Sequence, residues 1–166
     1  LDAEIIRPKT AKGPIPFVIL LHGCSGMNEL LTTWAHSYAE KIVGIGYGVL
    51  ILDSFTSRKV SNICTDPSQL GWARRRADDA YSALDYLIEN RLGISDKVFI
   101  LGRSNGATTA LLSMNKAKLN SYAPQARRDF IAAVTVRASA CCSARRLATR
   151  LLRLGNCWVG QPLPGT

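Results

Sequence analysis

Apolar runs and segments of helical periodicity alternate along the first 136 residues. Short runs rich in Val, Ile, Leu and Phe predict buried strands at residues 17–21, 47–52, 97–101 and 130–136. Between these runs, apolar residues recur every three or four positions and predict helices at residues 30–43, 72–90 and 105–116. This alternation predicts an α/β fold built on a parallel sheet.

The alternation stops after Val136. Residues 137–166 hold five arginines and no acidic residue, so more than half of the chain's net charge of +9 lies in this segment. The only element predicted there is a basic amphipathic helix over Ala144–Leu154, before a Gly- and Pro-rich end. We therefore divide the chain into a domain at 1–136 and an atypical basic tail at 137–166. The tail is either disordered or the product of a frameshift or truncation.

The composition excludes several classes of protein. The chain is 47% hydrophobic and 20% charged, as globular domains are. Its longest apolar run, 14–21, is far shorter than the roughly 20 residues of a membrane-spanning helix. The five cysteines form no CxxC pair and the two histidines lack zinc-finger spacing, so we expect neither a disulfide framework nor a metal site. Aromatic residues are scattered singly, which argues against a nucleic-acid surface.

The sharpest chemical signal is the pentapeptide Gly102-Arg103-Ser104-Asn105-Gly106, which matches G-x-S-x-G between a predicted strand and a predicted helix. A serine on such a tight turn needs small neighbours two residues to either side, and Gly102 and Gly106 meet that need. The turn raises the Ser104 hydroxyl above the sheet edge, while the N–H of Asn105 at the helix start can hold an oxyanion. The motif predicts Ser104 as a nucleophile, with a plain glycine-rich turn as the alternative interpretation.

A second motif, His22-Gly23-Cys24-Ser25-Gly26, directly follows the first predicted strand. In a hydrolase the loop at this place supplies a second backbone N–H to the oxyanion, and we assign that donor to Cys24. We interpret the Cys24 side chain as small and partly buried, because adjacent His and Cys residues on an extended chain point apart and cannot form a nucleophile–base pair. We expect His22 to brace the loop.

These two motifs, together with Gly-Tyr-Gly-Val-Leu-Ile-Leu-Asp-Ser-Phe at 46–55 and Arg-Ala-Asp-Asp-Ala at 76–80, resemble the α/β-hydrolase superfamily and, within it, the dienelactone hydrolase-like family. The resemblance covers residues 4–136. It implies a doubly wound, mostly parallel sheet of the α/β-hydrolase type that here lacks its last strands. It also implies cofactor-free hydrolysis of a carboxylic ester or lactone by Ser104. Family members that open dienelactone carry cysteine at the nucleophile position, so the serine favours a serine esterase.

The chain departs from this family in its acid and its base. An α/β-hydrolase carries an acid and then a histidine after the nucleophile, whereas only Asp129 and no histidine follow Ser104 here. Asp129 precedes a strand, so we expect it at the wrong edge of the sheet. His36 falls on a predicted helix away from the strand ends, and we expect Asp53 to cap the loop that follows it.

Two functions therefore remain open from the sequence. The first is a serine hydrolase for small-molecule esters or lactones whose triad acid and histidine are missing from this chain. The alternative is a catalytically inactive hydrolase-fold module that binds a ligand and places its basic tail on an anionic surface. We expect no membrane span, no nucleic acid and no metal, and the compartment stays open between cytoplasm and export.

The sequence also predicts an unpaired sheet edge and a charged helix face on the surface. The strand at 130–136 would leave an apolar sheet edge unpaired, which favours self-association unless the tail covers it. The run Arg74-Arg-Arg76 lies at helical distances from Asp78, Asp79 and Asp85, so we expect a solvated, charged helix face there.

Overall fold

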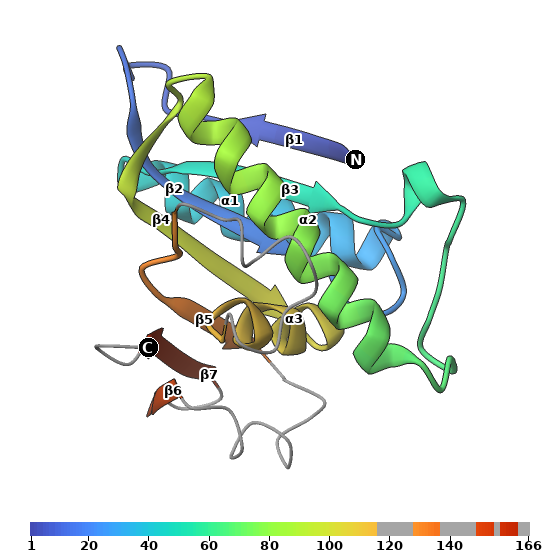
Figure 1. The fold of residues 1–166 in the computed structure, drawn as a ribbon. Helices are drawn as coiled ribbons and strands as arrows, with labels where there is room; N and C mark the ends of the chain where they lie inside the picture. Colours follow the sequence, from blue (N-terminus) through green and yellow to red (C-terminus); the bar gives the residue numbers. More distant parts are fainter. Residues whose placement is uncertain (116–127, 137–148, 155–156, 163–166) are drawn as a thin grey trace.

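The apolar runs form the parallel centre of one sheet in the computed structural model, which describes residues 1–115, 128–136, 149–154 and 157–162 (Figure 1). The parallel strands are β2 (Ile15–Leu21), β3 (Gly48–Asp53), β4 (Gly93–Arg103) and β5 (Ala133–Val136). They lie in the order β3-β2-β4-β5, so the chain crosses from β3 to the far side of β2. This crossover reverses the winding direction and makes the sheet doubly wound, as predicted.

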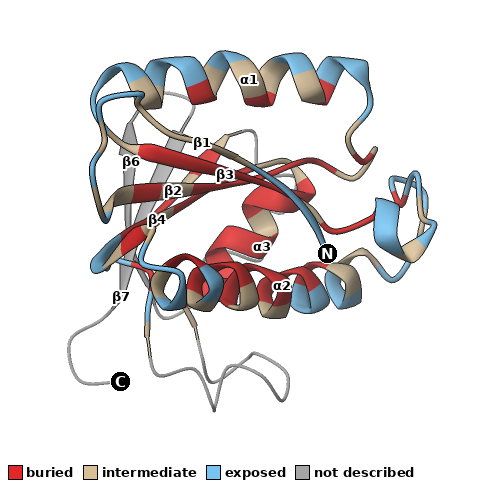
Figure 2. Ribbon diagram, turned by 90° about the horizontal axis from the view of Figure 1, so that it is seen from above, coloured by how far each residue is buried: buried red, intermediate tan, exposed pale blue. Residues whose placement is uncertain are grey.

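The predicted helices cover the two faces of the sheet. Helix α1 (Glu29–Gly44) lies on one face, and α2 (Gln69–Glu89) and α3 (Asn105–Ser113) lie on the other (Figure 2). One apolar cluster packs beneath α2 and α3, around Phe17 and Leu84, and a second packs beneath α1, around Ala35 and Ile51. Within the described ranges, no helix combines the length and the apolar character needed to cross a membrane.

Helix α1 has clear start and stop signals. The Asn28 side chain accepts a hydrogen bond from the N–H of Leu31 at 3.0 Å and so caps the first turn. Gly46, just past the end, has φ of 90°, a conformation that a side chain would strain. These signals fix where the chain leaves β2 and where it enters β3.

The first strand, β1 (Asp2–Ile6), escaped prediction. It pairs antiparallel with β3 at the edge of the sheet, and its first three residues are exposed. Only Ile5 and Ile6 face the packed faces of the sheet, where they join the two apolar clusters. Since an edge strand of five residues needs little apolar sequence, main-chain pairing forms it without a periodic signal.

The prediction of a helix over Ala144–Leu154 is wrong for its second half. Residues 149–154 form strand β6 (Thr149–Leu154), which pairs antiparallel with β7 (Cys157–Pro162), and β7 pairs antiparallel with β5. The edge of β5 offers a row of backbone N–H and C=O groups to β7, and β7 in turn offers its other edge to β6, whose pairing overrides local helix propensity. The tail therefore covers the edge of β5. The sheet order becomes β1-β3-β2-β4-β5-β7-β6.

Candidate active site

Ser104 occupies a strained turn between β4 and α3. Its φ of 55° and ψ of −117° lie in a region that non-glycine residues rarely adopt. Small neighbours make the turn possible: a Cβ added to Gly102 would lie 2.0 Å from the carbonyl oxygen of Gly106. One added to Gly106 would lie 2.4 Å from the carbonyl oxygen of Leu21. The two glycines of the motif thus touch each other and the neighbouring strand, and no larger residue fits at either place.

The loop after β2 lies directly beside this turn. A Cβ built on Gly23 would contact the Cβ of Ser104 at 3.5 Å. Because β2 leads to α1 on one face and β4 leads to α3 on the other, the two loops diverge at the carboxyl edge of the sheet. Asn105 opens α3, and the first N–H groups of a helix have no acceptor within it. The geometry brings Ser104, Asn105 and the Cys24 loop together.

His22 is buried and neutral. Its Nδ1 lies 2.7 Å from the carbonyl oxygen of Gly23, and its Nε2 lies 3.4 Å from the backbone nitrogen of Ser54, so Nδ1 carries the proton and Nε2 accepts. Burial, assisted by the charge of Arg76, lowers the pKa of His22 to about 3. Its ring also meets that of Phe55 edge-on at 4.6 Å. With both nitrogens engaged by the backbone, His22 braces the loop and is not placed to act as a base.

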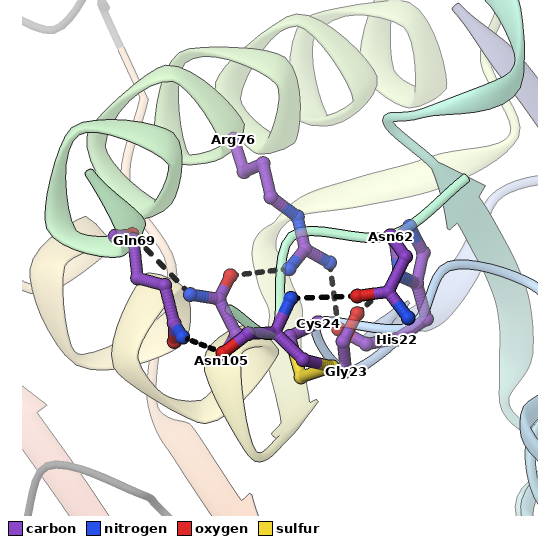
Figure 3. The surroundings of a disulfide bond; sticks show 8 residues. His22, Gly23, Cys24, Asn62, Gln69, Arg76 and Asn105 are labelled. Carbon is purple, nitrogen blue, oxygen red and sulfur yellow. Dashed lines mark hydrogen bonds between the residues drawn. A yellow bond between two sulfur atoms is a disulfide. The ribbon is translucent and has the colours of Figure 1, made fainter. Parts of the chain in front are cut away.

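A disulfide joins Cys24 to Cys64, although the sequence predicted no disulfide framework and a partly buried Cys24 side chain (Figure 3). The two cysteines are 40 residues apart in the chain, and no spacing motif links them, which is why their pairing was missed. Two further contacts bind the same loops together. The N–H of Ile63 donates to the carbonyl oxygen of Cys24 at 2.8 Å, and Gly26, with φ of 67°, packs against the carbonyl oxygen of Ser61.

Asp53 caps the loop after β3, as expected. Its Oδ1 accepts from the N–H groups of Phe55 and Thr56, and its Oδ2 accepts from the Thr56 hydroxyl at 2.6 Å. Burial alone would raise the pKa of Asp53, but these hydrogen bonds outweigh it and lower the pKa below its usual value. The loop then runs through a 3-10 turn, η1 (Thr56–Arg58), from which Arg58 reaches both carboxylate oxygens of Asp79 at 2.7 and 2.8 Å.

The prediction of a solvated, charged face around Arg74–Arg76 is wrong for Arg76 and for Asp79, which are both buried. Arg74 and Arg75 are exposed, but Arg76 has no exposed surface at all. Its guanidinium donates to the side-chain oxygen of Asn105 and to the carbonyl oxygen of His22, each at 2.7 Å (Figure 3). Counting charges at helical spacing could not separate these arginines, because the third one points at polar groups of other elements.

The remaining titratable candidates lie outside this site. His36, on α1, pairs with Glu4 of β1 at 3.2 Å. Asp129 precedes β5 and accepts a hydrogen bond from the hydroxyl of the buried Tyr81 at 3.3 Å. Among the described residues, no group of three His, Cys, Asp or Glu side chains could hold a metal ion. A cavity of about 350 Å³ lies elsewhere, lined by residues of β1, β3 and α2.

Comparison with solved structures supports the fold assignment. Esterase B from Lactobacillus rhamnosis is similar with a TM-score of 0.58 and 16% identity over 88% of this chain and 49% of its own. Acetyl xylan esterase from Aspergillus awamori has a TM-score of 0.54 and 19% identity over 82% and 47%. The chain has the α/β-hydrolase fold. Est1E from Butyrivibrio proteoclasticus is similar with a TM-score of 0.50 and 19% identity over 67% and 41%.

This likeness concerns the α/β-hydrolase fold and only part of each relative. The chain spans about half the length of esterase B and of the acetyl xylan esterase. No family model matches the sequence, and no curated protein sequence matches it significantly.

Proposed function

We propose that this chain carries the nucleophile and the oxyanion hole of a serine hydrolase that acts on carboxylic esters or lactones. The observation that carries the proposal is the strained turn at Ser104, with φ of 55° in a non-glycine residue and two glycines in mutual contact around it. Such strain persists only where the surrounding structure enforces it, and it concentrates at functional sites. The esterase names of two similar structures support an ester as the substrate class.

The proposed reaction has two steps. The Ser104 hydroxyl oxygen attacks the ester carbonyl carbon while a base takes its proton, and the N–H groups of Cys24 and Asn105 bind the oxyanion that forms. The C–O bond of the ester then breaks and the alcohol leaves with a proton. Water hydrolyses the acyl-serine in the same way, which releases the acid and restores Ser104. We also propose, from the motifs, that the chain is a member of the dienelactone hydrolase-like family.

Neither histidine of the described residues is placed to serve Ser104 as a base. The sequence holds two histidines. His22 is engaged by backbone groups at both ring nitrogens, and His36 pairs with Glu4. Without a base, the serine hydroxyl stays protonated near neutral pH and attacks slowly. The proposal therefore predicts that an external base accelerates acylation of Ser104.

Imidazole rescue tests this proposal. Hydrolysis of p-nitrophenyl acetate is measured for the wild-type chain, for Ser104→Ala and for Ser57→Ala, an exposed-serine control, across a series of imidazole concentrations. Imidazole also cleaves this ester in solution, and the Ser104→Ala rate gives that background. We expect the wild type and Ser57→Ala to exceed Ser104→Ala by an amount that grows with imidazole. Equal rates for wild type and Ser104→Ala at every concentration would contradict the proposal.

A second reagent separates nucleophile reactivity from turnover. A fluorophosphonate phosphonylates an activated serine by attack of the hydroxyl oxygen on phosphorus, with loss of fluoride. With imidazole present as the external base, we expect mass spectrometry to find the adduct on the peptide that contains Ser104 and not on Ser57. Labelling spread over several serines would argue against a specific nucleophile.

The binding-module alternative rests on the placement of the two histidines, neither of which serves Ser104. In that case the site beside Ser104 binds an ester or acid without turning it over, and the basic tail binds an anionic surface. Binding of the full chain to vesicles that contain anionic lipid should then weaken as salt rises, and it should weaken on Arg145→Gln/Arg146→Gln. Retention of anionic-vesicle binding at high salt would count against this function.

A further inference from the structure

Arg76 is a long cationic side chain that is fully buried beneath the candidate oxyanion hole. It extends from α2, and its guanidinium lies between Asn105 and His22 in Figure 3. One terminal nitrogen donates to the Asn105 side-chain oxygen, and the other donates to the main-chain oxygen of His22, both at 2.7 Å. Burying a charged group is costly unless its hydrogen bonds are satisfied. The two terminal bonds offset part of this cost, while the buried Nε of Arg76 has no hydrogen-bond partner among the described residues.

The two acceptors belong to the two segments that supply the proposed oxyanion donors. Asn105 follows Ser104 and opens α3, whereas the carbonyl of His22 starts the loop that leads through Gly23 to Cys24. A guanidinium is planar and rigid, so two bonds from its terminal nitrogens fix the separation and the tilt of the groups that accept them. Asn105 is held further by a hydrogen bond from its amide to the carbonyl oxygen of Gln69 at 3.3 Å.

The positive charge of Arg76 lies close to the proposed oxyanion hole. Both acceptors are neutral oxygens. The carboxylates of Asp79 and Asp53 also act on Arg76, but the first is bound by Arg58 and the second by the N–H of Phe55 and the hydroxyl of Thr56. Burial lowers the pKa of Arg76 to about 10, so the side chain remains charged at neutral pH. Its Cζ lies 5.1 Å from the ring centre of Phe55, where the negative face of the ring replaces part of the lost hydration. A buried cation beside two backbone donors creates a positive potential where an oxyanion would form.

We propose that Arg76 is a positioning residue that holds the Cys24 and Asn105 donors in register and makes the oxyanion hole electropositive. This inference rests on the proposed hydrolase function. A merely structural role would lower stability but leave the reactivity of the folded protein unchanged. A positioning role lowers the rate of the chemical step at saturating ester and leaves KM nearly unchanged, because the oxyanion exists only after attack begins.

The test uses the full chain with Arg76→Gln and Arg76→Lys. The readouts are kcat and KM for imidazole-supported hydrolysis of p-nitrophenyl acetate and the rate of Ser104 phosphonylation, with melting temperatures measured in parallel. We expect Arg76→Gln to lower both rates by about tenfold or more at similar KM, less than the loss of a whole oxyanion donor. Arg76→Lys keeps the charge but loses the fork, and we expect it to recover part of the loss.

Two controls separate positioning from folding. Arg128→Gln removes another arginine that binds to α2, through Asp85 at 3.1 Å, and should lower the melting temperature slightly without changing the rates. Asn105→Ala keeps the Asn105 backbone N–H but removes one acceptor of Arg76. We expect it to lower the rates as Arg76→Gln does, and the double variant to be no slower than the slower single variant. The Asn105→Ala comparison keeps the test decisive if Arg76→Gln fails to fold.

The outcomes distinguish this inference from the function on which it rests. A wild-type chain that reacts with neither reagent overturns the hydrolase proposal and this inference with it. A reactive wild type whose rates are unchanged in folded Arg76→Gln, or in Asn105→Ala, overturns only the inference. So does a rise in KM at constant kcat, since that pattern reports ground-state binding.

Discussion

Gly106 packs against the main chain of Leu21, so closely that an added Cβ would lie 2.4 Å from the Leu21 carbonyl oxygen. The added Cβ would also lie 2.5 Å from the carbonyl oxygen of His22. Neither of these two carbonyl groups can move without shifting the end of β2. We expect Gly106→Ala to lower the free energy of unfolding by about 1–3 kcal/mol, the range of overpacked sites. Urea unfolding followed by circular dichroism measures this loss.

The matched control for this glycine is Gly71, which lies in the first turn of α2 with no heavy atom within 4 Å of an added Cβ. Gly71→Ala should leave stability unchanged or raise it by about 0.5–1 kcal/mol, because alanine favours the helix. If Gly106→Ala proves as stable as Gly71→Ala, the close packing of the Ser104 turn against β2 is not present in solution.

The Cys24–Cys64 disulfide should contribute strongly to stability. It joins residues 40 positions apart in the chain. A cross-link of that span lowers the conformational entropy of the unfolded chain and so raises the free energy of unfolding by about 2–4 kcal/mol. We expect the oxidised wild type to unfold at a higher urea concentration than Cys24→Ala/Cys64→Ala. A reducing agent should lower the midpoint of the wild type and leave that of the double variant unchanged.

Formation of the Cys24–Cys64 disulfide can be measured directly. Free-thiol titration of the unfolded, unreduced wild type should find Cys24 and Cys64 protected, as peptide mapping after alkylation would reveal. Alkylation of both cysteines in protein kept from reductants would show that the bond does not form, and the stability difference should then vanish as well.

The central architecture was predictable because each buried strand and each helix carries its own periodic signal. Phe17–Leu21 and Lys97–Leu101 are continuous apolar runs, and the G-x-S-x-G turn states its geometry in five residues. The position of Ser104 between strand and helix followed from that local information. Its role as nucleophile stays a prediction.

What escaped prediction depends on contacts between residues far apart in the chain. Arg76 has the same local sequence environment as its exposed neighbours, and it is buried where residues distant in the chain, such as Asn105, His22 and Phe55, approach it. The pairing of Cys24 with Cys64 likewise depends on how the loop after β3 folds back. Strand β6 forms through main-chain pairing with β7, and the periodicity of its side chains does not predict that pairing.

The ion pair between Arg58 and Asp79 should anchor the loop after β3 to α2. Asp79 is almost fully buried, and Arg58 binds both of its carboxylate oxygens and also the carbonyl oxygen of Ser54. Removing one partner of a buried pair leaves the other uncompensated, so we expect Asp79→Ala to cost about 3 kcal/mol. Asp96→Ala, at an exposed site, is the control and should change stability by less than about 0.5 kcal/mol. Equal urea midpoints for the two variants would show that the pair contributes little.

His22 should make the fold sensitive to mild acid. Its pKa is about 3 in the folded chain, because of burial first and the Arg76 charge second, and near 6.5 when unfolded. The unfolded state therefore binds a proton that the folded state rejects. Stability is complete above pH 6.5 and falls as the pH drops toward 3, by about 2–3 kcal/mol between pH 6.5 and 4.5. Asp53, whose pKa is lowered from 3.8, adds its own loss of stability only below that interval.

Urea midpoints for wild type, His22→Gln and His36→Gln between pH 6.5 and 4.5 measure the effect. The acid-dependent loss should disappear in His22→Gln and persist in His36→Gln, and an unchanged slope in His22→Gln would contradict a buried, neutral His22.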